Sequence, residues 1–298
     1  MKLLGQLLEE GASRLSQKGI EEALLDARYL LLSVTGIRPA MFLIQKNEPA
    51  DKETAERFFE LIEQRGQRIP LQYILGTQEF MGLEFIVSPD VLIPRQDTET
   101  LTERVLADQK DKKLSGGALL DMCTGSGCIG LSLAVMGSFQ TLLAVDISKK
   151  ALAVAEKNAA RLLPEQVRKE KGLDVQLLES DLFQNIPSGR KFDVIVSNPP
   201  YIPSQVIEEL EPEVRDHEPR IALDGTGDGL EFYRRLAAES GSFLNPSGRI
   251  YLEIGYDQGL AVKELLERAG FIETQIIKDI PALDRVVTAK WPKEDPHV

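Results

Sequence analysis

The chain has 298 residues, of which 43% are hydrophobic and 28% are charged, an ordinary composition for a globular protein. This composition excludes the disordered and collagen-like classes. The formal net charge of −12 argues against a large phosphate-binding surface, because nucleic-acid binding depends largely on lysine and arginine that neutralise phosphates.

The N-terminus and the cysteine content indicate a cytoplasmic protein. The apolar core of a signal peptide is missing, since Glu9 and Glu10 interrupt the first apolar residues, and no run of about 18 uninterrupted apolar residues occurs. Cys123 and Cys128 lie in one short stretch, so we expect buried thiols that pack and no secreted disulfide framework. With two histidines in the chain, we expect no metal site. Because a long apolar run is missing, we also expect no membrane contact.

Residues 1–71 are expected to form a small helical bundle. Apolar residues recur at helical spacing in three stretches, which begin at Leu3, Ala23 and Ala55. Each stretch is apolar on one face and charged on the other, which is typical of helices packed around a shared core.

Residues 72–95 are expected to form a β-hairpin linker. Short apolar runs at Tyr73 to Leu75, Phe80 to Val87 and Val91 to Ile93 are separated by glycine and by a Ser-Pro pair. Such a change of period predicts short strands joined by turns.

Residues 96–298 are expected to form an α/β domain with a doubly wound, mainly parallel sheet, because strands and helices alternate. The expected strands are Ala118 to Cys123, Leu142 to Asp146, Val175 to Leu178, Asp193 to Ser197, Arg249 to Ile254, Thr274 to Lys278 and Arg285 to Lys290. The expected helices are Thr98 to Ala107, Ile129 to Met136, Lys149 to Leu163 and Leu260 to Ala269.

A glycine-rich turn follows the first of these strands. Gly125, Gly127 and Gly130 have the spacing G-x-G-x-x-G, and glycine at a strand-to-helix turn lets a ligand approach the main chain closely. The pattern suits a dinucleotide or S-adenosylmethionine, and alone it is often only a tight turn. Asp146 ends the second strand, where a carboxylate accepts from both ribose hydroxyls of either cofactor. The alternative for Asp146 is a helix N-cap shared with Ser148.

A second acidic residue follows the third strand. Asp181 is expected beside the same crevice, where it suits an adenine amino group, with Leu182 or Phe183 packed on the ring. S-adenosylmethionine carries no pyrophosphate, so its site needs carboxylates more than an anion cradle. Asp146 and Asp181 together therefore favour S-adenosylmethionine.

The fourth strand runs into Asn198-Pro199-Pro200-Tyr201. Two prolines cannot continue a strand, so this tetrapeptide is rigid, and its simplest alternative is a turn without chemistry. An amide nitrogen is a poor nucleophile because its lone pair is delocalised. The side-chain oxygen of Asn198 and the carbonyl of Pro199 would accept its two hydrogens, and Tyr201 offers a ring face for a planar group. We therefore expect methylation of an amide or amine nitrogen by positioning and hydrogen bonding, without a metal or covalent intermediate.

Further stretches resemble the PrmC/HemK family, and the resemblance covers nearly the whole chain. They are Arg68 to Gly76, Leu92 to Glu99, Glu218 to Asp224, Asp228 to Leu230, Tyr251 to Gly255 and Asp284 to Val287. Asp121 to Gly127, the end of the strand at Asp146 and Asn198 to Tyr201 look like class I methyltransferases that act on exocyclic or amide nitrogens. The resemblance implies a class I methyltransferase fold, Rossmann-like with a mainly parallel seven-stranded sheet, and a helical N-terminal domain that holds a protein substrate. It also implies N5 methylation of the glutamine in the Gly-Gly-Gln motif of bacterial peptide chain release factors, which act in translation termination. S-adenosylmethionine is then the methyl donor and S-adenosylhomocysteine the product.

The resemblance assigns roles residue by residue. Asn198, Pro199 and Tyr201 are implied as catalytic and, with Pro200, as substrate-binding. The implied cofactor-binding residues are Cys123, Thr124, Gly125, Ser126, Gly127, Asp146, Asp181, Leu182 and Asn198, with Arg95 and Thr98 lining the pocket.

Other activities share parts of these motifs. A DNA adenine-N6 or RNA methyltransferase can use the same tetrapeptide on a flipped base. However, the segment after Tyr201 has six carboxylates between residues 208 and 218 and only two nearby arginines, Arg215 and Arg220. Such an acidic flank repels the phosphates of nucleic acid. An NAD-dependent oxidoreductase leaves the tetrapeptide unexplained, and an inactive binding module has no support because the tetrapeptide is intact. We expect release factors as partners and no direct nucleic-acid contact.

Overall fold

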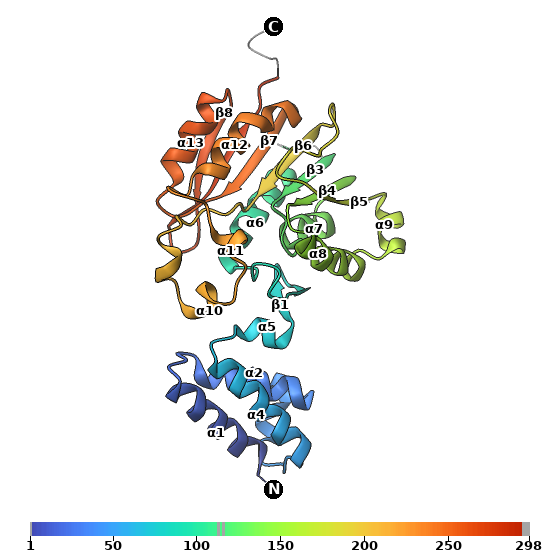
Figure 1. Cartoon of the computed structure of the whole chain (residues 1–298). Coiled ribbons are helices and arrows are strands. Elements are labelled where there is room, and N and C mark those ends of the chain that lie inside the picture. The colour runs from blue at the N-terminus through green and yellow to red at the C-terminus, as the bar shows by residue number, and fades with distance from the viewer. Residues whose placement is uncertain (1, 112–113, 115–116, 294–298) are drawn as a thin grey trace. The chain divides into compact units, whose positions relative to one another are not determined.

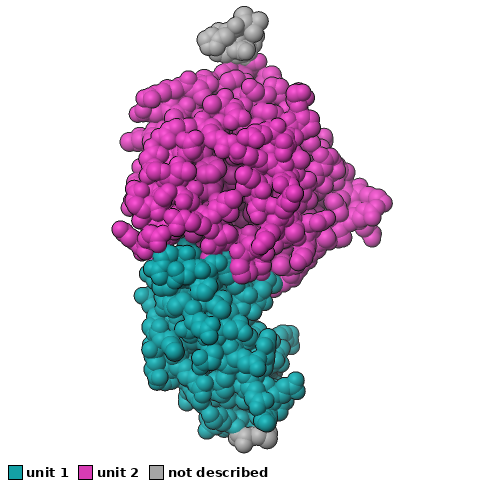
Figure 2. Space-filling model, viewed as in Figure 1, with its two compact units in different colours: residues 1–77, 211–217 teal, residues 78–210, 218–298 magenta. Residues whose placement is uncertain are grey.

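The computed structural model describes residues 2–111, 114 and 117–293. The chain forms two compact units, which Figure 2 shows in teal and magenta. Unit 1 comprises Met1–Thr77 and Glu211–His217, and unit 2 comprises Gln78–Leu210 and Glu218–Val298. A short segment from the second half of the sequence therefore belongs to the N-terminal unit.

Unit 1 is helical, as the sequence predicts (Figure 1). Its helices are α1 (Leu4–Gln17), α2 (Ala23–Thr35), α3 (Pro39–Gln45), α4 (Lys52–Gly66), α5 (Leu71–Leu75) and, from the distant segment, α10 (Pro212–Arg215). Leu7, Leu30 and Phe58 of α1, α2 and α4 are fully buried in its core. Asp51 caps α4 by accepting a hydrogen bond from the Thr54 backbone N–H at 2.7 Å.

No single helix among the described residues is long and apolar enough to cross a membrane. Helices α2 and α3 together meet those criteria by length and composition, with a bend of 88° between them.

The expected strands at Tyr73 to Leu75 and Val91 to Ile93 are wrong. Residues 71–75 form α5, because Pro70 starts a helical turn and Leu71, Ile74 and Leu75 pack against the core of unit 1. Residues 91–93 are irregular, although Val91 and Ile93 are buried. Between them, β1 (Thr77–Phe80) and β2 (Leu83–Ile86) pair as a two-stranded sheet, so the predicted hairpin is confirmed there.

Unit 2 contains a seven-stranded sheet, which confirms the predicted fold class. The strands are β3 (Ala118–Met122), β4 (Thr141–Asp146), β5 (Asp174–Glu179), β6 (Phe192–Ser197), β7 (Leu244–Glu253), β8 (Ile272–Lys278) and β9 (Asp284–Lys290). Their order is β5-β4-β3-β6-β7-β9-β8. Among these described strands, six run in the same direction and β9 runs in the opposite direction.

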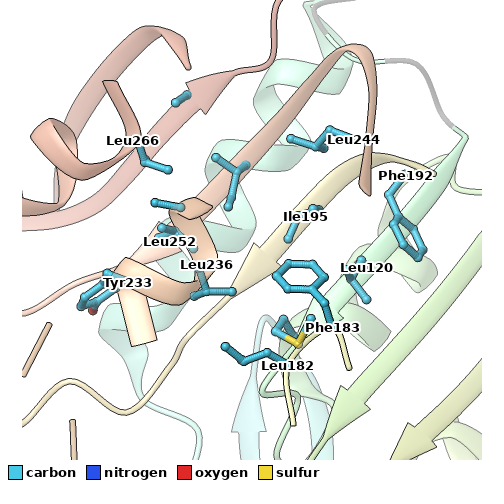
Figure 3. Packing of buried hydrophobic residues seen from close by; sticks show 14 of the residues in the cluster. Leu120, Leu182, Phe183, Phe192, Ile195, Tyr233, Leu236, Leu244, Leu252 and Leu266 are labelled. Atoms are coloured by element: carbon cyan, nitrogen blue, oxygen red, sulfur yellow. The ribbon is translucent and has the colours of Figure 1, made fainter. Parts of the chain in front are cut away.

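Helices cover both faces of this sheet. On one face, α12 and α13 contribute Tyr233, Leu236 and Leu266 to a core cluster (Figure 3). On the other face, α6, α7 and α8 contribute Leu101, Leu131 and other buried residues. The helices of unit 2 are α6 (Gln96–Lys110), α7 (Cys128–Met136), α8 (Lys149–Leu162), α9 (Glu165–Lys171), α11 (Arg220–Leu223), α12 (Glu231–Ser240) and α13 (Gly259–Arg268), with the 3₁₀ turns η1 (Ile207–Glu209) and η2 (Gly241–Phe243).

Helix α12 is absent from the sequence-based prediction. Its ten residues carry few apolar positions, chiefly Tyr233, Leu236 and Ala237, which are buried against the sheet. A helix this short is marginal in isolation, so its stability depends on tertiary packing more than on local pattern.

The register of the central strands aligns the ends of β3, β6 and β7. Met122 of β3 pairs with Ser197 of β6, and Ser197 pairs with Leu252 of β7. The Ser197 hydroxyl also donates to the Met122 carbonyl at 2.8 Å. The chain proceeds from β3 outward to β4 and β5 and then returns to β6, so the strand order reverses between β3 and β6. Ligands of open α/β sheets bind at such a reversal, outside the carboxyl ends of the strands.

Candidate active site

A cavity of about 300 Å³ lies in unit 2 at the carboxyl ends of β3, β4 and β6. This volume is at the lower end of about 300–1,000 Å³, the range typical of small-molecule sites. The predicted residues that line it are Arg95, Thr98, Cys123, Thr124, Gly125, Ser126, Asp146, Asp181, Leu182, Asn198 and Pro200. Of the other predicted residues, all of which the structure describes, Gly127, Pro199 and Tyr201 lie outside the lining.

The glycine-rich loop is held rigidly between β3 and α7. The Thr124 backbone N–H donates to the Val145 carbonyl at 2.9 Å, and the Gly127 N–H donates to the Thr124 carbonyl at 2.8 Å. Gly127 has a φ of 82°, and a Cβ there would lie 2.8 Å from a methyl carbon of Leu131. Glycine is therefore required at this position by both backbone conformation and space.

Asp121, the fourth residue of β3, stabilises the glycine-rich loop through hydrogen bonds. Its Oδ2 accepts from the Thr124 hydroxyl at 2.5 Å and from the Gly130 N–H at 3.0 Å. Burial raises the pKa of Asp121 to about 7, against these hydrogen bonds, which lower it. Asp121 is not among the predicted site residues, although a carboxylate inside an apolar strand is itself a signal of a special role.

Asp146 ties the glycine-rich loop to the end of β4. Its Oδ2 accepts from the Gly125 N–H and its Oδ1 from the Ser148 N–H, both at 2.9 Å. The N-cap of α8 is Ser148, whose hydroxyl accepts from the Ala151 N–H. Asp146 thus lines the cavity while it supports the loop, and burial raises its pKa.

Asp181 is paired at the same rim. Its Oδ1 accepts from Arg235 Nη2 at 2.8 Å, and its Oδ2 accepts from Gln184 Nε2 at 3.0 Å. Leu182 lines the cavity, whereas Phe183 stacks on Phe243 in the core, with ring centroids 4.7 Å apart. Figure 3 shows Phe183 among the core side chains. Of these two neighbours, Leu182 is therefore the apolar residue that faces the cavity.

The tetrapeptide 198–201 is braced by its surroundings. Asn198 Nδ2 donates to the Thr98 hydroxyl at 3.4 Å, and Gln258 Nε2 donates to the Tyr201 carbonyl at 3.0 Å. Gly229 has a φ of 73°, and a Cβ there would lie 2.3 Å from the Tyr201 carbonyl oxygen. The Tyr201 ring packs against the core, and burial raises the pKa of its phenol.

Arg95 lines the cavity and forms an ion pair with a buried acidic residue. Arg95 pairs with Glu218, which is 5% exposed. Burial raises the pKa of Glu218, against the charge and hydrogen bond of Arg95, which lower it. This pairing fixes a positive charge beside the cavity.

The two cysteines are free thiols that pack the turn. Cys128 is buried, and burial raises its pKa to about 12. Burial also raises the pKa of Cys123. Both side chains are therefore protonated at neutral pH and unreactive.

Comparison with known proteins identifies the family. Residues 6–76 match the PrmC N-terminal domain, and residues 97–210 match the methyltransferase small domain. The release factor glutamine methyltransferase of Geobacter sulfurreducens is 40% identical over 273 residues, covering 92% of this chain and 91% of that protein. The protein of that name from Bacillus subtilis is 38% identical over 293 residues, covering 97% and 98%.

The chain belongs to the release factor glutamine methyltransferase family. The resemblance drawn from the sequence is thereby confirmed. A crystal structure of a methyltransferase from Pyrococcus furiosus superposes with a TM-score of 0.51 at 18% identity, over 77% of this chain and 99% of that one. At this identity the likeness shows the methyltransferase fold alone.

In this family member, two polar residues of the site come from helices that sequence reasoning did not connect with it. Arg235 lies on α12, which the sequence did not predict, and Gln258 caps α13. Both are ordinary polar residues in the sequence, and only the fold brings them to Asp181 and Tyr201.

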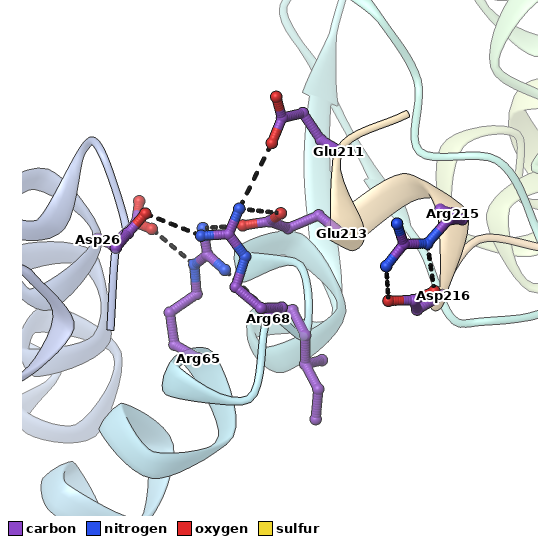
Figure 4. A network of polar contacts seen from close by, with 9 residues as sticks. Asp26, Arg65, Arg68, Glu211, Glu213, Arg215 and Asp216 are labelled. Atoms are coloured by element: carbon purple, nitrogen blue, oxygen red, sulfur yellow. Dashed lines mark hydrogen bonds and ion pairs between the residues drawn. The ribbon is translucent and has the colours of Figure 1, made fainter. Parts of the chain in front are cut away.

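The acidic flank after the tetrapeptide of this methyltransferase is largely paired. In unit 1, Arg68 contacts Glu213 at 2.9 Å and Glu211 at 3.5 Å, and Arg65 Nη2 contacts Glu213 at 2.9 Å (Figure 4). Arg65 Nε also pairs with buried Asp26 at 2.7 Å. Counting charges along the sequence therefore overstates the negative field of this flank, and the case against a nucleic-acid substrate rests on the family relationship.

Proposed function

We propose that this protein transfers a methyl group from S-adenosylmethionine to the N5 side-chain nitrogen of the glutamine in the Gly-Gly-Gln motif of peptide chain release factors. Asn198, which lines the cavity at the end of β6, carries the proposed chemistry. The choice of substrate is supported by relatives that bear this name and match this chain over nine-tenths of its length or more.

The cavity suits the proposed cofactor. A carboxylate of Asp146 on the lining offers acceptors for the ribose hydroxyls, and the main chain of Gly125 comes close enough for a small ligand to contact it. Asp181 and Leu182 are proposed to hold the adenine, with Cys123, Thr124, Ser126 and Gly127 around the methionine part. Bound there, S-adenosylmethionine supplies an electrophilic methyl group on its sulfonium.

The residues of this chain then act by positioning. The Asn198 side-chain oxygen and the Pro199 carbonyl are proposed to accept the two hydrogens of the glutamine amide. This grip turns the nitrogen lone pair toward the methyl group and stabilises the positive charge that develops on nitrogen as the N–C bond forms and the sulfonium C–S bond breaks. The nitrogen would then release one of its two hydrogens as a proton to water. Pro200 keeps the backbone rigid, and Tyr201 is proposed to contact the plane of the amide.

We propose that the chain organises this reaction in three parts: a helical domain at residues 1–71 that docks the release factor, a hairpin linker at residues 72–95, and a methyltransferase domain at residues 96–298. The matches to the PrmC N-terminal domain and to the methyltransferase small domain support this division. The enzyme would act in the cytoplasm, where translation termination takes place.

A labelling experiment tests the function. The purified protein is incubated with methyl-labelled S-adenosylmethionine and, separately, with a release factor, with its Gln→Ala variant in the Gly-Gly-Gln motif, and with duplex DNA. Label is expected on the unmodified release factor alone. Label on DNA and none on the release factor would replace this proposal with an exocyclic-amine methyltransferase.

A further inference from the structure

Glu253 is a buried carboxyl directly beside the tetrapeptide. It is the last residue of β7 and is 2% exposed. Ser197 of β6 pairs with Leu252 of β7, so the next residues on the two parallel strands are Asn198 and Glu253. Glu253 does not line the cavity, whereas Asn198 does.

The polar side chains beside Glu253 link it to Asn198. Against burial, which raises the pKa of Glu253, the Thr98 hydroxyl and the Asn198 amide lower it as hydrogen-bond donors. Asn198 Nδ2 also donates to the Thr98 hydroxyl oxygen at 3.4 Å. Because a carboxylate only accepts, Thr98 donates its own hydrogen to Glu253 and keeps its oxygen free to accept from Asn198.

This arrangement decides which way the Asn198 carboxamide points. With its nitrogen toward Glu253 and Thr98, its oxygen Oδ1 points away from them. The opposite orientation would place Oδ1 against a carboxylate and leave buried acceptors facing one another, which is unfavourable. The Oε2 atom of Glu253 is buried and, among the described residues, has no hydrogen-bond partner. A buried acceptor without a partner is costly, so its retention beside the tetrapeptide requires an explanation other than packing.

We propose that Glu253 is a positioning residue, which together with Thr98 holds the Asn198 amide nitrogen so that Asn198 Oδ1 faces the nitrogen to be methylated. Glu253 acts through Asn198 and does not touch the substrate. The kinetic consequence rests on the proposed function, whereas the orientation of Asn198 does not.

Charged and titratable groups on several elements interact electrostatically with Glu253. They are Asp97 of α6, Cys128 of α7, Tyr201 after β6, Tyr233 of α12 and Arg285 of β9. Burial raises the pKa of Glu253 to about 7, against the hydrogen bonds of Thr98 and Asn198 and the charge of Arg285, which lower it. Arg285 itself is shared with Asp97 and Asp279, each at 3.1 Å. The carboxylate form, which holds the Asn198 nitrogen most firmly, thus forms as pH rises through 7.

The kinetic test compares two substitutions of Glu253 with a matched control. Glu253→Met keeps the length of the side chain but removes the acceptor, and we expect kcat to fall about 10²-fold at pH 8, the size of losing one transition-state contact. Glu253→Gln retains one neutral acceptor oxygen, and we expect a fall of about tenfold. The KM for the release factor and the affinity for S-adenosylmethionine should change less than about threefold in both, as for a contact made in the transition state.

The control is Asp108→Asn, which also converts a buried carboxyl to an amide. Asp108 is 1% exposed and bonds to Tyr251, on the same strand as Glu253, at 2.9 Å. It lies outside the cavity lining, so kcat should stay within about twofold even where the protein is less stable. A Glu253→Met variant with the kcat of the parent overturns the proposal, and so does a loss of cofactor affinity in proportion to kcat, which indicates a purely structural role.

A second measurement requires no turnover. The side-chain NH₂ resonances of Asn198, assigned by their loss in Asn198→Asp, are followed by NMR from pH 5.5 to 8.5. We expect them to titrate with a midpoint near 7 in the parent and to be insensitive in Glu253→Gln, because the carboxyl that they report is gone. Resonances that titrate identically in both proteins, or in neither, overturn the proposal. A parent that shows this titration but leaves release factors unmethylated contradicts the proposed function and not this inference.

Discussion

Replacing Glu253 with glutamine is expected to change how the stability of the protein depends on pH. Burial raises the pKa of Glu253 from an ordinary value of 4.5 to about 7, so the folded protein holds this proton more tightly than the unfolded chain does. Stability from this group is therefore complete below pH 4.5 and is lost as pH rises through 7. A difference of about 2.5 pKa units at 1.36 kcal/mol per unit gives a total on the order of 3 kcal/mol.

The assay is urea unfolding of the parent and of Glu253→Gln at pH 5 and pH 8. The glutamine side chain of the variant is uncharged throughout, so the free energy of unfolding of the variant relative to the parent should rise by about 2–3 kcal/mol from pH 5 to pH 8. Asp121, whose pKa is also raised to about 7 by burial, contributes equally in both proteins and cancels. A difference that stays constant within about 0.5 kcal/mol over this range would refute the assignment of a buried, late-ionising carboxyl to Glu253.

Three further outcomes follow from the contacts. Asp146→Asn should weaken S-adenosylmethionine binding by about 10–100-fold in calorimetry, because charged hydrogen bonds to the ribose become neutral; an unchanged Kd would exclude the ribose role. Arg65→Ala leaves the buried Asp26 carboxylate without this ion-pair partner and should lower the free energy of unfolding by about 3–5 kcal/mol. Arg57→Ala, which removes an ion pair with the exposed Glu60, should lower it by at most about 1 kcal/mol, and equal losses in the two variants would contradict the importance of the buried pair. Gly229→Ala places a Cβ against the tetrapeptide backbone and should lower kcat by about 10²-fold. In Gly227→Ala the added Cβ has no atom within 4 Å, so the kcat of this control should be close to that of the parent. Similar kcat values in the two variants would show that the tetrapeptide tolerates displacement.

Local patterns were sufficient for most of the fold. Most strands of the large sheet contain a short apolar run, and the glycine-rich turn and the tetrapeptide follow two of these runs directly in sequence. Because parallel strands end at one edge of a sheet, the sequence could place Gly125, Asp146 and Asn198 near one another, and the cavity indeed contains all three.

The rest depends on contacts between distant segments. Residues 73–75 have a pattern too short to separate a strand from a helix, and packing in unit 1 selects the helix. Arg235 and Glu253 reach the site through α12 and β7, 34 and 52 residues beyond Tyr201, so strand order and register decide their neighbours. Pairing of the acidic flank with arginines of unit 1 is likewise invisible to a count of charges.

The decisive measurement is the position of the transferred methyl group on the release factor. A release factor methylated by this enzyme is digested and its peptides are fragmented in a mass spectrometer, in parallel with material treated with Asn198→Ala. We expect one added methyl on the side-chain nitrogen of the glutamine in the Gly-Gly-Gln motif, and a loss of about 10²–10³-fold in rate for the variant with cofactor binding retained. A methyl group on any other residue, or a variant with the rate of the parent, would contradict this expectation.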